Sequence, residues 1–120
     1  MELQYIHEQE VTMAISPDLI RGHTDNIILR FLYDHDSYGY EINRNIHIMT
    51  DGEYELSEAT LYTAFRRLEK EGCIESYWGD ENSGARRRYY RITDKGKKKY
   101  DDNLKEWEES YRMIERLIRR

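Results

Sequence analysis

The stretch that decides the fold is residues 57–72, which read SEATLYTAFRRLEKEG. Ser57 is a favourable helix N-cap, and Glu58 would lie near the positive end of the helix dipole. Gly72 suits a left-handed C-cap, so we predict a helix from Glu58 to Glu71. At about 100° per residue, one face of this helix is apolar. Its residues are Leu61, Ala64, Phe65 and Leu68.

The opposite face of the same helix carries cations and hydroxyl groups. Arginine donates two parallel hydrogen bonds to guanine edges and phosphates, and hydroxyls with free backbone N–H groups at a helix start can bind phosphate. The pattern favours a helix that contacts DNA, although a solvated amphipathic helix would show it too. The residues on this face, at its edge or at the helix start are Ser57, Thr60, Tyr62, Thr63, Arg66, Arg67 and Lys70.

Two β-type runs follow the helix, over residues 74–78 and 88–93. The intervening segment 79–87 is rich in Gly, Asp, Asn and Ser, which predicts a hairpin loop. Alternation along a strand would place Arg86 and Arg88 on one side and Arg87 on the other. Three arginines beside a turn are costly to bury and favourable against phosphate, so we add these arginines and Tyr90 to the candidate DNA contacts. The alternative is a solubilising turn.

Upstream of this region, two more helices are predicted. Ser16-Pro17-Asp18 is a helix start, and this first helix should run to about Tyr33. Ser37 should cap a second helix that ends at Asp51-Gly52. Three helices followed by a hairpin form a winged helix-turn-helix, a mainly α (α+β) fold. In that fold the third helix enters the DNA major groove and the hairpin tip touches the backbone or minor groove.

A last helix of about 25 residues should begin at Thr93-Asp94 and carry an apolar stripe with heptad spacing. Such a stripe next to a small domain favours pairing with a second copy, and a two-fold dimer favours a roughly palindromic operator. The alternative is that the helix folds back on its own domain. A second role for Trp107 and Tyr111 would be to line a pocket for a flat aromatic effector. The stripe consists of Tyr100, Leu104, Trp107, Tyr111, Ile114 and Ile118.

Length and charge are consistent with this organisation. The 120 residues suit one domain, which we divide into an arm (1–16), a DNA-binding unit (17–96) and a dimerisation helix (97–120). The net charge is −5, but residues 86–99 hold eight basic residues and one acid. That segment therefore carries +7 and the remainder −12. A basic patch on an acidic protein indicates a surface that binds a polyanion.

Other function classes find little support. No apolar run could cross a bilayer, no signal-peptide pattern is visible, and the single Cys73 cannot form an internal disulfide, so we expect a cytoplasmic protein. The four histidines fall in no metal-ligand spacing, and HExxH, CxxC and P-loop patterns are missing. We expect no catalysis, cofactor or metal. A winged module that binds protein instead of DNA stays open, and it predicts that charge reversal at residues 86–88 leaves function intact.

The chain resembles the PadR family of transcriptional regulators. The resemblance covers about 90 residues, from Leu19 to Trp107, and rests on LIRG (19–22), SYGYEI (37–42), LSEATLY (56–62), RLEKEG (67–72), RRRYYRIT (86–93) and Lys95-Gly96. It implies a dimeric repressor of the short subgroup with one C-terminal dimerisation helix, and a response to small aromatic compounds. Thr63 stands where the family usually has proline, which would alter base preference. The implied DNA contacts are Ser57, Thr60, Tyr62, Arg66, Arg86, Arg87 and Arg88.

Overall fold

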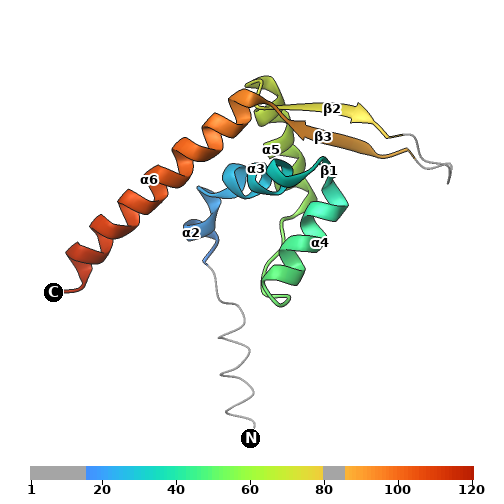
Figure 1. Cartoon of the computed structure of the whole chain (residues 1–120). Coiled ribbons are helices and arrows are strands. Elements are labelled where there is room, and N and C mark those ends of the chain that lie inside the picture. The colour runs from blue at the N-terminus through green and yellow to red at the C-terminus, as the bar shows by residue number, and fades with distance from the viewer. Residues whose placement is uncertain (1–15, 80–85) are drawn as a thin grey trace, which may run out of the picture.

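A computed structural model of the chain describes residues 16–79 and 86–120, and shows a small helical domain with a hairpin and one long helix (Figure 1). Residues 1–15, which make up all but the last residue of the predicted arm, lie outside the described residues, as does the hairpin tip at 80–85. The elements are α2 (Pro17–Arg21), α3 (Thr24–Asp34), β1 (Ser37–Tyr38), α4 (Gly39–Met49), α5 (Glu58–Lys70), β2 (Ile74–Trp78), β3 (Arg88–Ile92) and α6 (Asp94–Ile118).

The core lies where α3, α4 and α5 meet the sheet. Ile28, Leu29 and Leu32 of α3 are buried with Ile42 and Ile46 of α4. They pack with the apolar face of α5, and all four residues predicted for that face are buried. The hairpin of β2 and β3, hereafter the wing, and α6 project from this core in opposite directions (Figure 1). The predicted winged helix-turn-helix with a long C-terminal helix is confirmed.

The predicted first helix is broken, which corrects the sequence interpretation. Ser16 caps α2 by accepting a hydrogen bond from the Asp18 backbone N–H at 3.2 Å, as expected. However, α2 ends at Arg21, Gly22 is its C-cap, and α3 starts at Thr24. Glycine costs about 1 kcal/mol relative to alanine inside a helix, so the chain bends there at little cost. The bend leaves Leu19 exposed while α3 buries Thr24 and the core residues that follow.

The predicted role of Ser37 as a helix cap is also wrong, because Ser37 belongs to strand β1 and does not cap α4. The three-stranded sheet has the order β1-β3-β2, and Ser37 pairs with Tyr90. Tyr38 occupies the N-cap position of α4. The Ser37 hydroxyl donates to the Glu41 carboxylate at 2.5 Å, so the buried hydroxyl is satisfied by a side chain of the helix.

The start of α6 is held on the turn that follows α5. Gly72 has φ +78°, the left-handed conformation predicted for a C-cap. Thr93 caps α6 by accepting from the Gly96 N–H at 3.1 Å, and its own hydroxyl donates to the Gly72 carbonyl at 2.7 Å. The predicted start of the last helix at Thr93-Asp94 is therefore confirmed. Within residues 16–79 and 86–120, no helix is both long enough and apolar enough to cross a membrane.

Candidate nucleic-acid interface

The polar face of α5 is open to solvent. Ser57 caps the helix, with its oxygen 3.1 Å from the Thr60 N–H that donates to it. Its hydroxyl donates to the Thr60 hydroxyl at 2.9 Å. Arg66 lies beside Thr63, with a guanidinium nitrogen 3.3 Å from the threonine oxygen. All the α5 residues that the sequence predicted as DNA contacts are exposed: Ser57, Thr60, Tyr62, Thr63, Arg66, Arg67 and Lys70.

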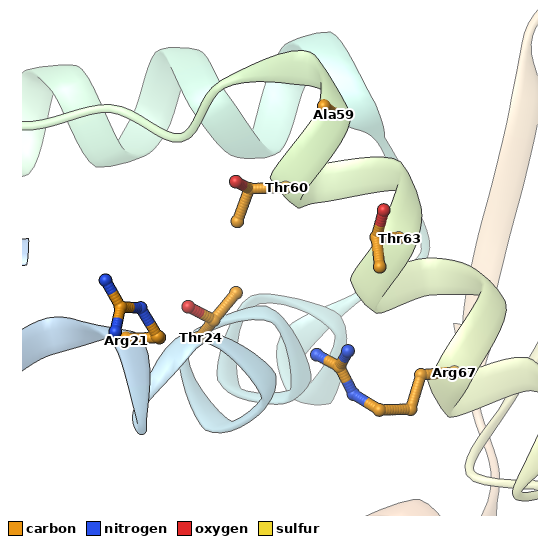
Figure 2. Close-up of a pocket in the computed structure, with 6 residues that line it drawn as sticks. All are labelled: Arg21, Thr24, Ala59, Thr60, Thr63 and Arg67. Carbon is orange, nitrogen blue, oxygen red and sulfur yellow. The ribbon is translucent and has the colours of Figure 1, made fainter. Parts of the chain in front are cut away.

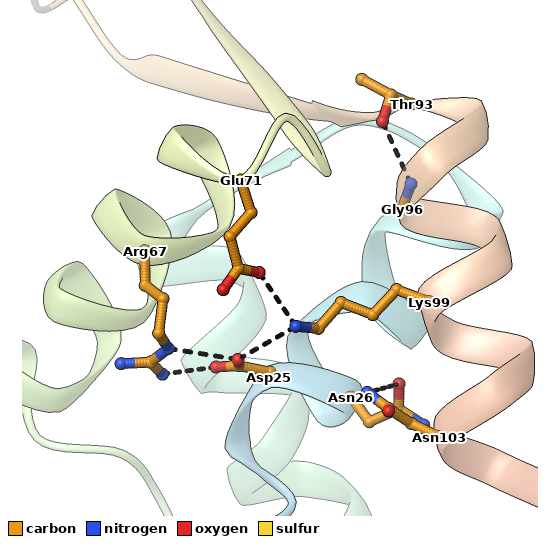
Figure 3. Close-up of polar contacts among 8 residues, drawn as sticks. All are labelled: Asp25, Asn26, Arg67, Glu71, Thr93, Gly96, Lys99 and Asn103. Carbon is orange, nitrogen blue, oxygen red and sulfur yellow. Dashed lines mark hydrogen bonds and ion pairs between the residues drawn. The ribbon is translucent and has the colours of Figure 1, made fainter.

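One edge of this face is anchored to α3 and α6 by charges. Arg67 makes two hydrogen bonds to the Asp25 carboxylate, and this contact raises the pKa of the guanidinium. Lys99 of α6 lies 4.0 Å from the same carboxylate and 2.9 Å from that of Glu71 (Figure 3). Arg67 is therefore both a member of the exposed face and an internal partner of α3. Sequence reasoning missed this network, because Asp25 and Arg67 are 42 positions apart.

The wing arginines are arranged around aromatic rings. The guanidinium carbons of Arg86 and Arg88 lie 4.9 and 5.7 Å from the centre of the Trp78 ring. That of Arg87 lies 4.8 Å from the centre of the Tyr38 ring. The contacts follow the alternation predicted for these three arginines. Cation–π contacts restrict the arginine side chains, and all three arginines stay exposed. Trp78 was not identified from the sequence, although an aromatic facing an arginine run across a hairpin is a usable signal.

Arg88 also ties the wing to α5. Its guanidinium donates to the Ser76 hydroxyl at 2.7 Å and lies 3.6 Å from the Glu69 carboxylate. The Ser76 hydroxyl donates to the same carboxylate at 2.5 Å. These contacts fix the base of the wing against the helix. Ser76 and Glu69 are positioning residues that the sequence analysis did not single out.

Tyr90 was a wrong assignment, because the structure places it in the core. Only 4% of its surface is exposed, and its ring stacks on Phe65 with centroids 3.9 Å apart. Burial raises the pKa of its phenol. In a strand with alternating sides, Tyr90 is inward and its neighbours Tyr89 and Arg91 are less buried. A residue covered in this way cannot reach a DNA surface.

The apolar stripe on α6 divides into two parts. Tyr100 packs on its own domain, where its ring meets Tyr33 at 5.4 Å between centroids. This part follows the fold-back alternative. The later residues stay exposed within the single chain: Leu104, Trp107, Tyr111, Ile114 and Ile118.

A groove of about 880 Å³ runs between α6 and the α2–α3 segment. Its lining includes Leu19, His23, Phe31 and Trp107, so it combines apolar and aromatic side chains. His23 meets Trp107 edge to face at 4.7 Å between ring centroids. Tyr111 lies next to Trp107, at 5.6 Å, but does not itself line the groove.

The described part of the chain holds neither a metal-binding cluster nor a reactive thiol. No group of three His, Cys, Asp or Glu residues there could hold a metal ion. Cys73 is buried, and this burial raises the pKa of its thiol. A thiol held protonated in an apolar site is a packing residue and a poor nucleophile.

Several known proteins are similar to this chain in sequence and fold. The sequence pattern of the "Transcriptional regulator PadR-like family" matches residues 28–102. A transcriptional regulator from Clostridium thermocellum is 51% identical, with TM-score 0.81, over 88% of this chain and all of that one. A PadR family transcription regulator from Clostridium difficile R20291 is 33% identical, with TM-score 0.68, over 80% and 98%. "Uncharacterized protein X" of Lysinibacillus sphaericus is 46% identical over 84% of this chain and 93% of that protein.

Proposed function

The chain belongs to the PadR-like family of transcriptional regulators, and from this premise we propose that it is a homodimeric repressor that binds a roughly palindromic operator. Family membership makes it a DNA-binding transcription regulator. The proposal extends this statement to the sign of regulation, the oligomeric state and the operator. Because its partner is chromosomal DNA, we also propose that it acts in the cytoplasm. Regulators of this family are generally not enzymes, and we propose the same for this chain.

The observation that carries the proposal is that α5 and the wing, two elements joined to each other, both carry exposed cations. Arg66 and Lys70 on α5 are exposed, and the wing with Arg86 and Arg87 is joined to the same helix through Arg88 and Glu69. A helix of about 10–12 Å diameter fits the roughly 12 Å width of the major groove. With α5 in that groove, the wing extends beside it to the sugar–phosphate backbone. We therefore assign base contacts to Arg66 and Lys70 of α5 and backbone contacts to the wing.

Dimerisation is supported by the uncovered half of the α6 stripe. Trp107, Tyr111, Ile114 and Ile118 recur at heptad spacing on a helix whose end projects from the domain. Exposed apolar side chains in such a row are costly in water and gain most when a copy of the same helix covers them. The two-fold axis would present two α5 helices to DNA. Half-sites one helical turn apart, or a multiple of it, should follow.

We also propose that a small aromatic compound releases the repressor from DNA. Support comes from the groove between α6 and α2–α3, which offers Trp107, His23 and Phe31 to a flat ring. A ligand there would contact the helix that joins the two protomers, so it could change the spacing of the two α5 helices. Fluorescence provides the test, with Trp78→Phe leaving Trp107 as the reporter. Saturable quenching accompanied by loss of operator affinity supports release, and unchanged affinity at saturating ligand contradicts it.

Footprinting tests the main proposal. We would map nuclease protection of the DNA upstream of its own gene, with wild-type protein and with Arg66→Ala. The proposal predicts two protected half-sites related by a two-fold axis, reduced protection in the variant, and fewer transcripts from that promoter when wild-type protein is added in vitro. A single protected site would contradict the dimeric operator. More transcripts would contradict repression.

A further inference from the structure

The side of α5 that faces away from the wing carries a groove lined by two arginines. It has a volume of about 260 Å³ and lies between α5 and the α2–α3 segment (Figure 2). Arg21 and Thr24 face Thr60 of α5 across it, and Arg67 closes one end (Figure 2). Its lining residues are Arg21, Thr24, Ala59, Thr60, Thr63 and Arg67. Neither Arg21 nor Thr24 was a candidate from the sequence.

The contacts of α5 show that this groove and the wing lie on opposite flanks of the helix. Glu69 contacts the wing through Ser76 and Arg88. Arg67, two residues earlier, contacts Asp25 of α3. Two residues correspond to about 200° around a helix, so these contacts point in nearly opposite directions. The exposed side chains of Thr63, Arg66 and Lys70 lie between them, on the side left for DNA.

A helix that fills the major groove has a sugar–phosphate strand along each flank, because its diameter nearly equals the groove width. The wing arginines account for one strand only. The other strand must pass the α2–α3 side, where Arg21 and Arg67 lie on the same groove as three threonine hydroxyls. We infer that this groove binds one phosphate of the DNA backbone, with Arg21 and Arg67 as its cations and Thr60 and Thr63 as hydroxyl donors. The inference rests on the proposed DNA binding.

The acidic residues near the groove leave this assignment intact. The Asp25 carboxylate pairs with Arg67 and lies 4.0 Å from Lys99, which pairs with Glu71 at 2.9 Å, so two cations balance two carboxylates there. Asp25 thereby holds Arg67 at the groove as a positioning residue. Asp18 pairs with Arg21 at 3.2 Å, but both side chains are more than 70% exposed. An exposed pair of this kind exchanges readily for a phosphate partner.

The salt dependence of DNA binding tests the inference without knowledge of the operator. We would measure the affinity for a short random-sequence duplex over a range of salt concentrations. For each phosphate that a variant no longer neutralises, the slope of log K against log salt should become less negative by about 0.9. We expect that change for Arg21→Gln/Arg67→Gln. Arg112→Gln/Arg116→Gln removes the same charge from exposed positions of α6 and should keep the wild-type slope.

Each result has a separate meaning. An unchanged slope in the groove variant, or an equal change in the α6 control, overturns the phosphate site while DNA binding stands. Wild-type protein that fails to bind any duplex overturns the proposed function as well. The single variant Arg21→Gln is the control for misfolding, because Arg21 is exposed and its replacement should leave the fold intact. It should shift the slope in the same direction without changing the unfolding midpoint. If phosphorus NMR shows inorganic phosphate bound in an Arg21-dependent way while the DNA slope is unchanged, the site takes a small anion and the DNA assignment is wrong.

Discussion

Replacing Gly96 by alanine should destabilise the domain more than any other single methyl addition at a described glycine. Gly96 lies in the first turn of α6, against the turn that follows α5. A Cβ there would lie 2.1 Å from the Cys73 carbonyl oxygen and 2.7 Å from Cγ1 of Ile92. Because the first of these atoms belongs to the backbone, the start of α6 has to move away from the turn between α5 and β2.

The size of the effect follows from the interactions that this movement breaks. The Thr93 N–H donates to the Cys73 carbonyl at 3.0 Å, and the Thr93 hydroxyl donates to the Gly72 carbonyl at 2.7 Å. Loss of two hydrogen bonds costs about 2 kcal/mol. The overpacked methyl adds about 1–3 kcal/mol. Alanine returns about 1 kcal/mol through its helix propensity. We therefore expect the free energy of unfolding to fall by about 2–4 kcal/mol.

Urea unfolding followed by circular dichroism measures this change, at one fixed protein concentration because dimerisation couples stability to concentration. Gly22→Ala is the matched control, because a methyl group at Gly22 would meet no atom beyond its immediate chain neighbours within 4 Å and the backbone φ there is −70°. It should be neutral or stabilise by about 0.4–1 kcal/mol. A Gly96→Ala protein as stable as wild type would refute the docking of α6 described above.

Three further predictions concern the dimer, the core and pH. Ile114→Asp should shift sedimentation from dimer to monomer, because it places a charge in the uncovered stripe; an unchanged dimer would exclude that stripe as the interface. Phe65→Leu should lower the unfolding free energy by roughly 1–3 kcal/mol, since it removes the ring stacked on Tyr90; a smaller loss in urea unfolding would mean that the stack adds nothing. Stability should fall as pH rises above about 10, because the raised pKa values of Tyr90 and Lys99 mean that the folded state binds more protons there. Tyr90→Phe should reduce that fall in urea titrations, and an equal fall in the variant would count against it.

Sequence periodicity predicted the third helix, the wing and the last helix, because each depends on local signals. Ser57, Gly72 and Thr93 are caps whose chemistry acts over three or four residues. The apolar face of α5 follows from helical spacing alone. The same periodicity missed the break at Gly22, because a helical stripe continues across it and only the burial of Thr24 distinguishes the two sides.

The errors at Ser37 and Tyr90 have one common cause, which is long-range strand pairing. Ser37 lies opposite Tyr90 in the β1–β3 ladder, over a separation that no local pattern reports. Pairing turned a predicted helix cap into a strand residue and turned a predicted DNA contact into a core residue. Arg21 was missed for a similar reason. It becomes a candidate only when α2 is placed beside α5, from which it is separated by more than thirty residues.

The most direct test of DNA binding through the wing is the affinity of the protein for its own promoter DNA. It would be titrated with salt for wild type and for Arg86→Glu/Arg87→Glu. Both arginines are exposed, so the reversal should leave the fold intact. We predict tight wild-type binding that weakens steeply with salt and collapses in the variant. Wild-type binding no tighter than to a random duplex, with the variant binding equally well, would contradict the account.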